Sequence, residues 1–444
     1  MVRHALLCLY SRRKMGKKLY KKGGLIILTY YWPPSGGSGV QRWMYFSKYL
    51  KELGWEPFVI TVDEKKASYP VLDMSLEKIV KNIKVIKTST NEPLKLFSFL
   101  TTGGFRKGIP QGEVKNRGLF NKLSNYLRAN CFIPDARVGW VNYAYRECEK
   151  IIIKNNIRHV ITTGPPHSSH LIGLKIKKDF KINWTVDFRD PWVNIFYNKQ
   201  FLFTEKSINK QKRLEKEVLN NADLVLTTIG GDLKKQLQLK APNQNFAVVP
   251  NGYDSVLINK IKGKKSKKYF HIVYSGLLTR NHPYLSLLKN LKQNFSNINL
   301  KLSLAGNISH EIINEIKNFL PNFKVKDCGY LNHEDTVRLI KSADLLVNFF
   351  FIGGEKEMIS GKIMEYLATE IPILSIGDPK SEAGKILSKA SQAKMFLKDS
   401  DKEIEQFLKK VILNRGKLIN SFPNLDNWSR KKITKKLSNL LSEL

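Results

Sequence analysis

The chain has 444 residues, of which 42% are hydrophobic and 11% aromatic, enough to fill the cores of two domains. No apolar run reaches about 18 residues, so the sequence predicts no transmembrane helix. The four cysteines are scattered without a C-x-x-C pair, which favours free thiols in a reducing compartment and excludes a cysteine-based metal site.

The formal net charge is +37, from 75 Lys and Arg residues against 38 Asp and Glu residues. A field of this size attracts polyanions, either nucleic acid or anionic lipid headgroups, although dispersed lysines also form an ordinary solvated surface. Residues 1–23 are predicted to be a basic extension. Their apolar piece is too short for the core of a signal peptide, so they are either a membrane-binding arm or a segment upstream of a natural start at Met15.

The segment GLIILTY, residues 24–30, predicts a buried strand that leads through the loop WPPSGGSGVQR into a helix. Gly36, Gly37 and Gly39 would let the backbone of this loop approach a ligand closely, and a strand, Gly-rich loop and helix commonly bind phosphate.

Two other interpretations of this loop stay open. A dinucleotide-binding turn would use Asp63, which follows the second predicted strand, as the acid that binds a cofactor ribose. Against that interpretation, the loop is long, contains two prolines and places Arg42 where a third glycine belongs. The loop is otherwise an ordinary connection between a strand and a helix.

Two later strands end in polar side chains. His167 and His170 follow the strand HVITTG, and Asp187, Arg189 and Asp190 follow INWTV. Doubly wound sheets bind ligands at the carboxyl ends of their strands, so these side chains are candidates for contact with a ligand. The alternative for the aspartates is an ion pair with Arg189 that fixes the loop. Between these strands and the first loop, residues 91–130 have weak periodicity and predict a loop with short helices.

The stretch GGEKEMISGKIMEYLATEIPIL, residues 353–374, lies between two apolar runs that are typical of buried parallel strands. A helix must therefore connect them. Ser360 is a suitable cap for this helix. Its apolar face is predicted at Ile363, Met364, Leu367 and Ala368.

The start of that helix suits a phosphate, because unpaired N–H groups of Ser360, Gly361 and Lys362 would face it together with the Lys362 ammonium. One turn later, an ionised Glu365 only accepts hydrogen bonds and suits the paired hydroxyls of a ribose. Glu357 lies on the preceding loop and would reach a second group of the same ligand. Alternatively, Lys362 and Glu365 are an exposed pair and Glu357 is a solvated loop charge.

The spacing of Glu357 and Glu365, followed by YLATEIPIL, resembles the nucleotide-sugar signature of retaining GT-B glycosyltransferases. GKIMEYLA resembles the form of this signature in bacterial glycosyltransferase family 4. The segments WPPSGGSGVQR, TTGPPHSSHLIGLK, VDFRDPW and VVPNGYD resemble the same family, so the resemblance runs from about residue 24 to the end. It implies that Glu365 binds the ribose and Glu357 contacts the donor sugar.

The resemblance also implies the remaining assignments. Residues expected to orient the sugar and the acceptor are Glu357, His167 and Asp187. Donor-binding residues are expected to be Gly37, Ser275, Gly276, Arg280, Asn307, Ser360, Gly361, Lys362 and Glu365, and acceptor-side residues Gly36, Gly39, Arg42, Arg189 and Asp190. The Lys that the family usually carries about five positions after Arg280 is missing, and Lys362 is the predicted substitute. An aspartate pair at Asp399 and Asp401 is predicted to cap a helix rather than to bind metal.

The sequence therefore predicts an α/β protein of GT-B type, with two Rossmann-like doubly wound domains that face each other across a cleft. The expected parts are a first domain (24–259), a linker (260–268), a second domain (269–420) and a carboxyl-terminal helix (421–444) that packs on the first domain. The expected reaction is metal-independent, retaining transfer from a nucleotide-sugar to a hydroxyl acceptor, with no cofactor.

The expected acceptor is a lipid-linked or surface-polysaccharide intermediate. It would be reached in the cytoplasm, at the anionic inner face of the cytoplasmic membrane, without a specific nucleic-acid partner. Two other classes of protein remain open: an NAD-dependent oxidoreductase that uses the first loop, and a basic nucleic-acid-binding protein.

Overall fold

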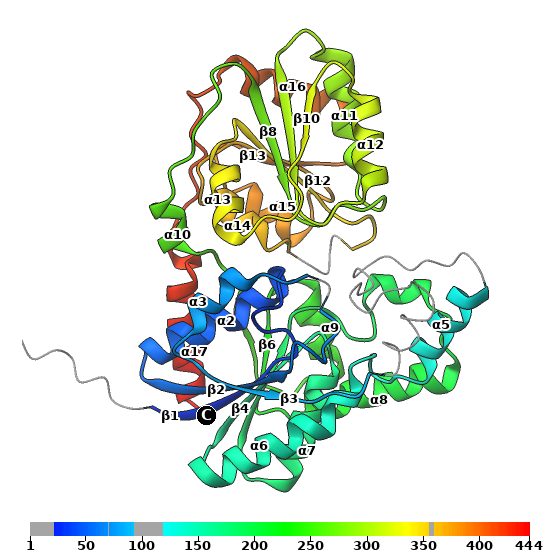
Figure 1. The fold of residues 1–444 in the computed structure, drawn as a ribbon, viewed down its shortest axis with the longest axis vertical. Helices are drawn as coiled ribbons and strands as arrows, with labels where there is room; N and C mark the ends of the chain where they lie inside the picture. The colour runs from blue at the N-terminus through cyan, green and yellow to red at the C-terminus, as the bar shows by residue number, and fades with distance from the viewer. Residues whose placement is uncertain (1–21, 70, 93–118, 355–358) are drawn as a thin grey trace, which may run out of the picture.

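The computed structural model describes residues 22–69, 71–92, 119–354 and 359–444. Two separate sheets organise these residues, and the strands of each sheet run parallel (Figure 1). The first sheet has the order β3-β2-β1-β4-β5-β6-β7, with β1 (Gly23–Leu28), β2 (Trp55–Val62), β3 (Lys84–Thr88), β4 (His159–Gly164), β5 (Asn183–Phe188), β6 (Leu224–Thr227) and β7 (Phe246–Val248). The second has the order β10-β9-β8-β11-β12-β13, with β8 (Phe270–Ser275), β9 (Leu300–Ala305), β10 (Lys324–Asp327), β11 (Leu345–Phe349), β12 (Ile373–Ile376) and β13 (Ala393–Phe396).

In both sheets the chain begins in the middle, builds outward to one edge and then returns to build the other edge. This is the doubly wound order, in which the strand order reverses beside the first strand. The predicted α/β fold with two Rossmann-like domains is therefore confirmed.

The strands form where the sequence has continuous apolar runs, because both faces of a doubly wound sheet are covered by helices. Leu25, Ile26, Ile27 and Leu28 of β1 are all 0% exposed. Helices connect the strands. In the first domain they are α2 (Ser38–Glu52), α3 (Glu77–Val80), α5 (Leu119–Asn130), α6 (Val141–Asn155), α7 (Ser168–Asp179), α8 (Glu205–Asn221) and α9 (Asp232–Lys240). The remaining helices are α10 (Ser255–Lys260), α11 (Tyr284–Asn294), α12 (His310–Phe319), α13 (His333–Lys341), α14 (Lys362–Leu367), α15 (Glu382–Leu387), α16 (Asp401–Leu413) and α17 (Arg430–Ser442).

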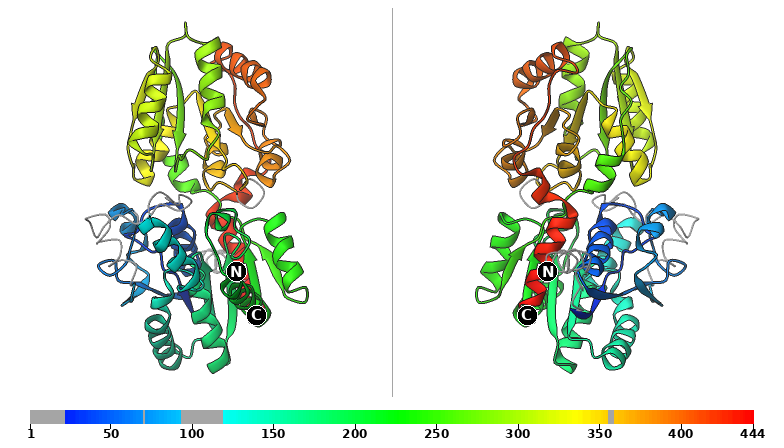
Figure 2. Two further views of the ribbon diagram at one scale, coloured as in Figure 1. Left: turned by 90° about the vertical axis from the view of Figure 1, so that its right-hand side faces the viewer. Right: turned by 90° about the vertical axis from the view of Figure 1, so that its left-hand side faces the viewer.

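The chain passes between the two sheets twice, and the two passages lie side by side. The Tyr253 N–H donates to the Trp428 carbonyl at 3.1 Å, and the Arg430 N–H donates to the Tyr253 carbonyl at 2.9 Å. Beyond this point α17 runs along the first domain (Figure 2), where Ile433, Leu437 and Leu441 share a buried cluster with residues of α2.

The two domains also touch across the space between them. The Glu382 carboxylate of α15 accepts the Gly230 N–H at 3.0 Å and the Gly231 N–H at 2.6 Å, just before α9 begins. On another side, the Tyr330 hydroxyl lies 3.5 Å from the Asp73 carboxylate. These residues follow β12, β6, β10 and β2, so the carboxyl edges of the two sheets face one another.

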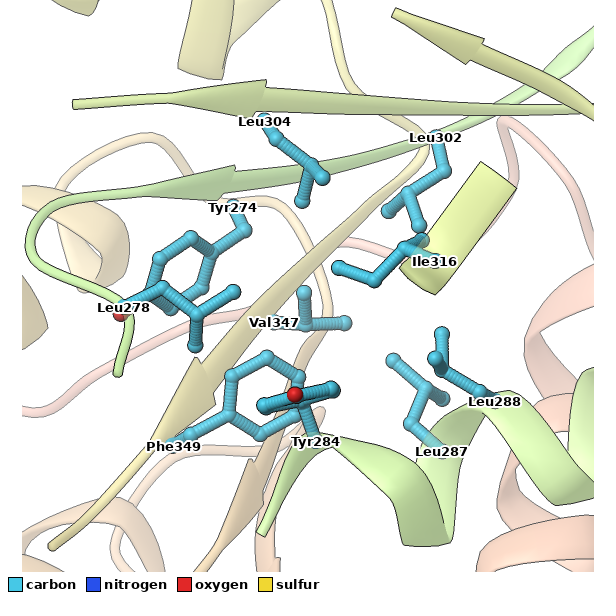
Figure 3. A pocket seen from close by; sticks show the side chains of 10 residues that line it. All are labelled: Tyr274, Leu278, Tyr284, Leu287, Leu288, Leu302, Leu304, Ile316, Val347 and Phe349. Atoms are coloured by element: carbon cyan, nitrogen blue, oxygen red, sulfur yellow. The ribbon is translucent and has the colours of Figure 1, made fainter. Parts of the chain in front are cut away.

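A small cavity lies in the core of the second domain (Figure 3). Its volume is about 10 Å³, which is space for a single water molecule at most. The lining is almost wholly apolar: Tyr274, Leu278, Tyr284, Leu287, Leu288, Leu302, Leu304, Ile316, Val347 and Phe349. The cavity is a packing gap between the sheet and the helices, and the candidate site lies elsewhere.

Among the helices described, none combines the length and the apolar character that a membrane span needs.

Candidate functional site

The predicted site residues follow the strands at the two places where strand order reverses. In the first sheet, the Gly-rich loop follows β1 and the loop with His167 follows β4, and these two strands are neighbours. In the second sheet, Gly276 follows β8 and the segment that leads to Lys362 follows β11, again on neighbouring strands. Ligands of open α/β sheets bind at such points, outside the carboxyl ends of the strands.

The Lys362 side chain reaches back from α14 to the turn after β8. A Cβ atom built on Gly276 would lie 2.7 Å from the Lys362 ammonium nitrogen, and the Gly276 φ of 126° is one that side chains rarely adopt. The ammonium lies 4.1 Å from the centroid of the Tyr274 ring. Within the described parts of the chain, no hydrogen bond or ion pair of this ammonium is recorded. Burial lowers the pKa of Lys362 to about 7.

The turn after β8 is also held by Tyr366 of α14 and by the turn after β9. The Tyr366 hydroxyl accepts the Ser275 N–H at 3.0 Å and lies 3.1 Å from the Ser275 hydroxyl. A Cβ built on Gly306 would lie 2.2 Å from the Gly276 carbonyl oxygen, so the turns after β8 and β9 touch through their glycines. The structure thus brings Ser275, Gly276 and Lys362 together, and their contact with a donor stays a prediction.

The helix itself is shorter than expected. It begins at Lys362 with Gly361 as its N-cap and without a side-chain capping bond, so the prediction that the Ser360 side chain caps it is wrong. Its apolar face agrees with the prediction, because Ile363, Met364 and Leu367 are buried. A helix of six residues has less than two turns of aligned peptide dipoles, so the charge at this site comes mainly from the Lys362 ammonium.

Glu365 is bound by two basic side chains. Its Oε1 atom lies 2.8 Å from His333 Nε2 and 3.3 Å from Arg430 Nη2. Burial by itself raises the pKa of this carboxyl, but His333 and Arg430 outweigh that effect and hold the pKa below its usual value. The carboxylate is therefore ionised at neutral pH, and its side chain keeps 12% of its surface exposed.

Two predicted donor residues lie further out. Arg280 is exposed and lies 3.8 Å from Glu311, its recorded ion partner. Asn307 is exposed, and its backbone carbonyl accepts the Leu278 N–H at 3.3 Å. Within the described part of the chain, neither side chain forms a hydrogen bond or ion pair with Lys362. Glu357 lies outside the described residues.

Arg42 and Asp187 form a buried ion pair. The Arg42 guanidinium donates to both carboxylate oxygens, at 3.0 and 2.7 Å, and the two side chains are 1% and 0% exposed. Trp43 and Thr163 also donate to Asp187, at 2.7 and 2.8 Å, while Arg42 binds the Val249 carbonyl at 2.7 Å. These contacts are internal and tie α2 to β4 and β5. Direct contact of either side chain with a substrate stays a prediction.

Arg189 connects the loop that follows β1 to the loop that follows β4. Its Nη1 atom donates to the Gly39 carbonyl at 2.5 Å and its Nε atom to the Gly164 carbonyl at 3.2 Å. The alternative ion pair between Arg189 and Asp187 is not formed, because Asp187 pairs with Arg42. Burial raises the pKa of the neighbouring Asp190 carboxyl, and Arg189 partly offsets this effect.

The remaining glycines of the first loop occupy tight or unusual positions. A Cβ built on Gly36 would lie 2.6 Å from the Tyr330 hydroxyl of the other domain, and the φ of Gly37 is 96°. The first loop therefore passes directly against the second domain.

His167 and His170 lie together over Gly164. A Cβ on this glycine would lie 2.7 Å from His167 Nδ1 and 2.6 Å from His170 Nε2. His167 stacks on Trp192 with ring centroids 4.9 Å apart. Both imidazoles are buried, and burial lowers the pKa of His170 to about 3 and that of His167 well below its usual value. Both are therefore neutral at physiological pH.

Four residues around Glu365 have no local signal in the sequence. His333 begins α13, Arg430 begins α17, and Gln41 and Tyr45 belong to α2. Each is an ordinary polar residue in its own segment. Their relevance depends on the way in which three distant helices meet.

No protein-family model matches the chain, and no curated protein matches it. Solved structures do. A glycosyltransferase from Rickettsia africae superposes with a TM-score of 0.59 at 16% identity over 96% of this chain and 99% of that one. The Anabaena protein HepE in complex with UDP and glucose gives 0.60 at 12% identity over 95% and 100%. The lipopolysaccharide outer core galactosyltransferase WaaB gives 0.55 at 14% identity over 95% and 100%.

At these identities the likeness concerns the fold. It extends over nearly the whole of each chain, so both domains and their connections are matched together. The chain thus has the two-domain GT-B architecture of these structures.

Proposed function

We propose that the protein is a retaining glycosyltransferase of the family 4 type, which moves a sugar from a nucleotide-sugar to a hydroxyl acceptor. The observation that carries this proposal is the position of Lys362. Its ammonium lies over Gly276 at the reversal point of the second sheet, and the ionised carboxylate of Glu365 lies one helical turn away. A cation followed by an anion at this spacing suits a diphosphate followed by a ribose.

The chemistry follows from these charges. As the bond between the sugar and the diphosphate breaks, negative charge grows on the departing phosphate oxygen, and a preorganised cation in a partly buried site stabilises it. Lys362 supplies that charge, with Arg280 as a second cation if its exposed side chain turns toward the phosphates. The proposal therefore assigns no role to a metal ion.

The first domain would hold the acceptor. His167 is neutral, so it would act on a sugar or acceptor hydroxyl as a hydrogen-bonding group rather than as a cation. Gly36 lets the first loop approach the other domain closely, and Gly39 lets it approach Arg189 of the neighbouring loop. Glu357 is proposed to contact the donor sugar, on the strength of the sequence resemblance.

The proposed acceptor is a lipid-linked or polysaccharide intermediate at the anionic inner face of the cytoplasmic membrane. The net charge of +37 supports this location. Among the structurally similar proteins, HepE was solved with UDP and glucose, and WaaB is a lipopolysaccharide galactosyltransferase. We therefore expect the purified protein to bind anionic vesicles at physiological salt. Absence of binding would contradict the membrane location and leave the donor chemistry standing.

The test of the donor chemistry is a screen of UDP-, GDP- and ADP-sugars that follows the release of nucleoside diphosphate. We expect release from one base class, with loss of nucleotide binding in Glu365→Ala. Glu403→Ala is the matched control, because Glu403 is an exposed glutamate on α16. The oxidoreductase alternative instead predicts tight NADH binding. The nucleic-acid alternative predicts steeply salt-dependent binding of DNA or RNA that Glu365→Ala leaves unchanged. Either outcome, without diphosphate release, would overturn the proposal.

A further inference from the structure

Arg430 is the first residue of α17, yet its side chain reaches the second domain. The side chain is 6% exposed, and its guanidinium donates through Nη2 to Glu365 Oε1 at 3.3 Å and to Gln41 Oε1 at 2.7 Å. Its central carbon lies 4.2 Å from the centroid of the Tyr45 ring. One buried cation therefore joins α14 of the second domain to α2 of the first.

The two basic partners of Glu365 use only one of its oxygens. His333 and Arg430 both bind Oε1, and no bond of Oε2 is recorded within the described parts of the chain. Oε2 is not one of the fully buried polar atoms without a partner. Since it has no hydrogen bond in the described part of the chain, it must be in contact with solvent. The carboxylate is therefore held at one oxygen and open at the other.

The backbone that carries Arg430 is fixed by the passage between the domains. Its N–H donates to the Tyr253 carbonyl at 2.9 Å, and Gly252 packs so closely that an added Cβ would lie 2.6 Å from the Trp428 carbonyl. The Tyr45 ring beneath the guanidinium is anchored by its hydroxyl, which donates to Asp254 at 2.6 Å. The position of the guanidinium thus depends on both chain passages and on α2.

The charged groups around Glu365 favour its ionised form. His333 on α13 and Arg430 on α17 contact it directly, and the Lys362 ammonium on its own helix points away to Gly276. The Nε and Nη1 atoms of Arg430 are buried without a hydrogen-bond partner. A cation with unused donors is costly to bury for stability alone, which points to a functional reason for its position.

We propose that Arg430 is a positioning residue of the donor site: from the helix that packs on the first domain, it orients the Glu365 carboxylate so that Oε2 is presented to the ribose of the nucleotide. The inference rests on the proposed function, because it needs Glu365 to bind a ribose. It adds that recognition of the nucleotide by the second domain depends on the carboxyl-terminal helix and on the relative placement of the two domains.

The test measures the affinity for the nucleoside diphosphate released in the donor screen, between pH 5 and 8, for the full chain and for Arg430→Gln, Arg430→Lys and Lys431→Gln. We expect about a tenfold or larger loss of affinity in Arg430→Gln, because the Glu365 carboxylate loses the charge-assisted hydrogen bond that orients it. Without Arg430 the pKa of the buried Glu365 rises, so binding should also fail at a higher pH as the solution is acidified. Arg430→Lys should restore part of both effects, and the exposed Lys431 should matter for neither.

A second variant guards against misfolding of Arg430→Gln. Gln41→Ala leaves the guanidinium in place but removes its anchor on α2, so we expect a smaller loss of affinity in the same direction. Wild-type affinity and an unchanged pH dependence in folded Arg430→Gln would overturn the inference while the proposed function stood. If the wild-type protein binds no nucleoside diphosphate, the proposed function fails first and takes the inference with it.

Discussion

At the scale of single residues, Lys362 is a lysine whose charge depends on pH near neutrality. Burial lowers its pKa to about 7, so the ammonium is mostly present below pH 7 and is lost as the pH rises through that value. The nearby His282 has a pKa lowered to about 4, first by burial and then by Lys362, and it stays neutral. A bound diphosphate would favour the protonated lysine and raise its pKa.

We therefore expect nucleoside diphosphate binding to weaken as the pH rises above about 7 and to take up a proton at pH 8, where the ligand itself is fully ionised. Calorimetry in two buffers of different ionisation enthalpy measures this uptake. Lys362→Met should abolish it and lower the affinity about 10- to 100-fold. Equal heats in both buffers for the wild type would contradict the assignment of Lys362 to the phosphate.

For Asp187 we predict a loss of stability, because its hydrogen bonds are all to buried residues of the first domain. Asp187→Asn would leave the buried Arg42 guanidinium without its counter-charge, and breaking such a pair costs about 3–5 kcal/mol of unfolding free energy. Denaturant unfolding of the variant measures the loss. Asp179→Asn is the control, because that carboxylate bonds to Tyr145 at an exposed position. A stable but inactive Asp187→Asn would favour direct contact with a substrate instead.

At the scale of elements, the site is made of turns that leave parallel strands. The turns after β8 and β9 meet through Gly276 and Gly306, and both glycines have a φ of 126°. Because Gly276 has no side chain, the Lys362 ammonium can lie over the backbone of the first turn. A turn of this kind works only while no side chain occupies that space.

Gly276→Ala should therefore displace the Lys362 ammonium and weaken nucleotide binding, in addition to a backbone strain of about 1–3 kcal/mol. Gly416→Ala is the matched control: its φ is 75°, so it also strains the backbone, but no atom lies within 4 Å of the added Cβ. Nucleotide affinity and thermal unfolding are measured for both variants. Equal affinities would show that the position of Lys362 over Gly276 is not needed for binding.

At the scale of the whole molecule, hydrogen bonds cross the space between the two domains. Glu382 is the clearest of these, because both of its oxygens accept backbone N–H groups at the start of α9. Figure 1 shows α15 and α14 at the end of the second domain that faces the first. The same interface thus carries a bond between the domains and the candidate donor site.

Glu382→Ala removes two charge-assisted hydrogen bonds, each worth about 1.5–3 kcal/mol, and should shift the molecule toward a more open arrangement. Small-angle scattering would record a larger radius of gyration, with each domain unchanged. The exposed Glu403→Ala serves as control. An unchanged radius together with unchanged thermal unfolding would show that Glu382 does not hold the domains.

The sequence by itself determined the two doubly wound sheets and the edge of the second sheet at which Lys362 lies. Apolar runs separated by helical periodicity specify parallel strands with covered faces, and a loop between such strands must end at the same edge of the sheet. The local pattern therefore predicts that residues 360 to 365 follow β11 at the carboxyl edge of the second sheet, as they do, and their binding roles stay predictions. The two capping predictions, by Ser360 and by Asp399 and Asp401, were wrong, because the exact start of a helix depends on its surroundings.

Only the tertiary structure decided which partners the charged residues take. Arg42 and Asp187 are 145 positions apart, and Glu365 and Arg430 are 65 apart. No periodicity relates such residues, because their contact depends on how whole helices pack and on where the chain returns between the domains. A buried charge must find a counter-charge wherever packing places one, so the pairing is a property of the assembled molecule and not of any segment.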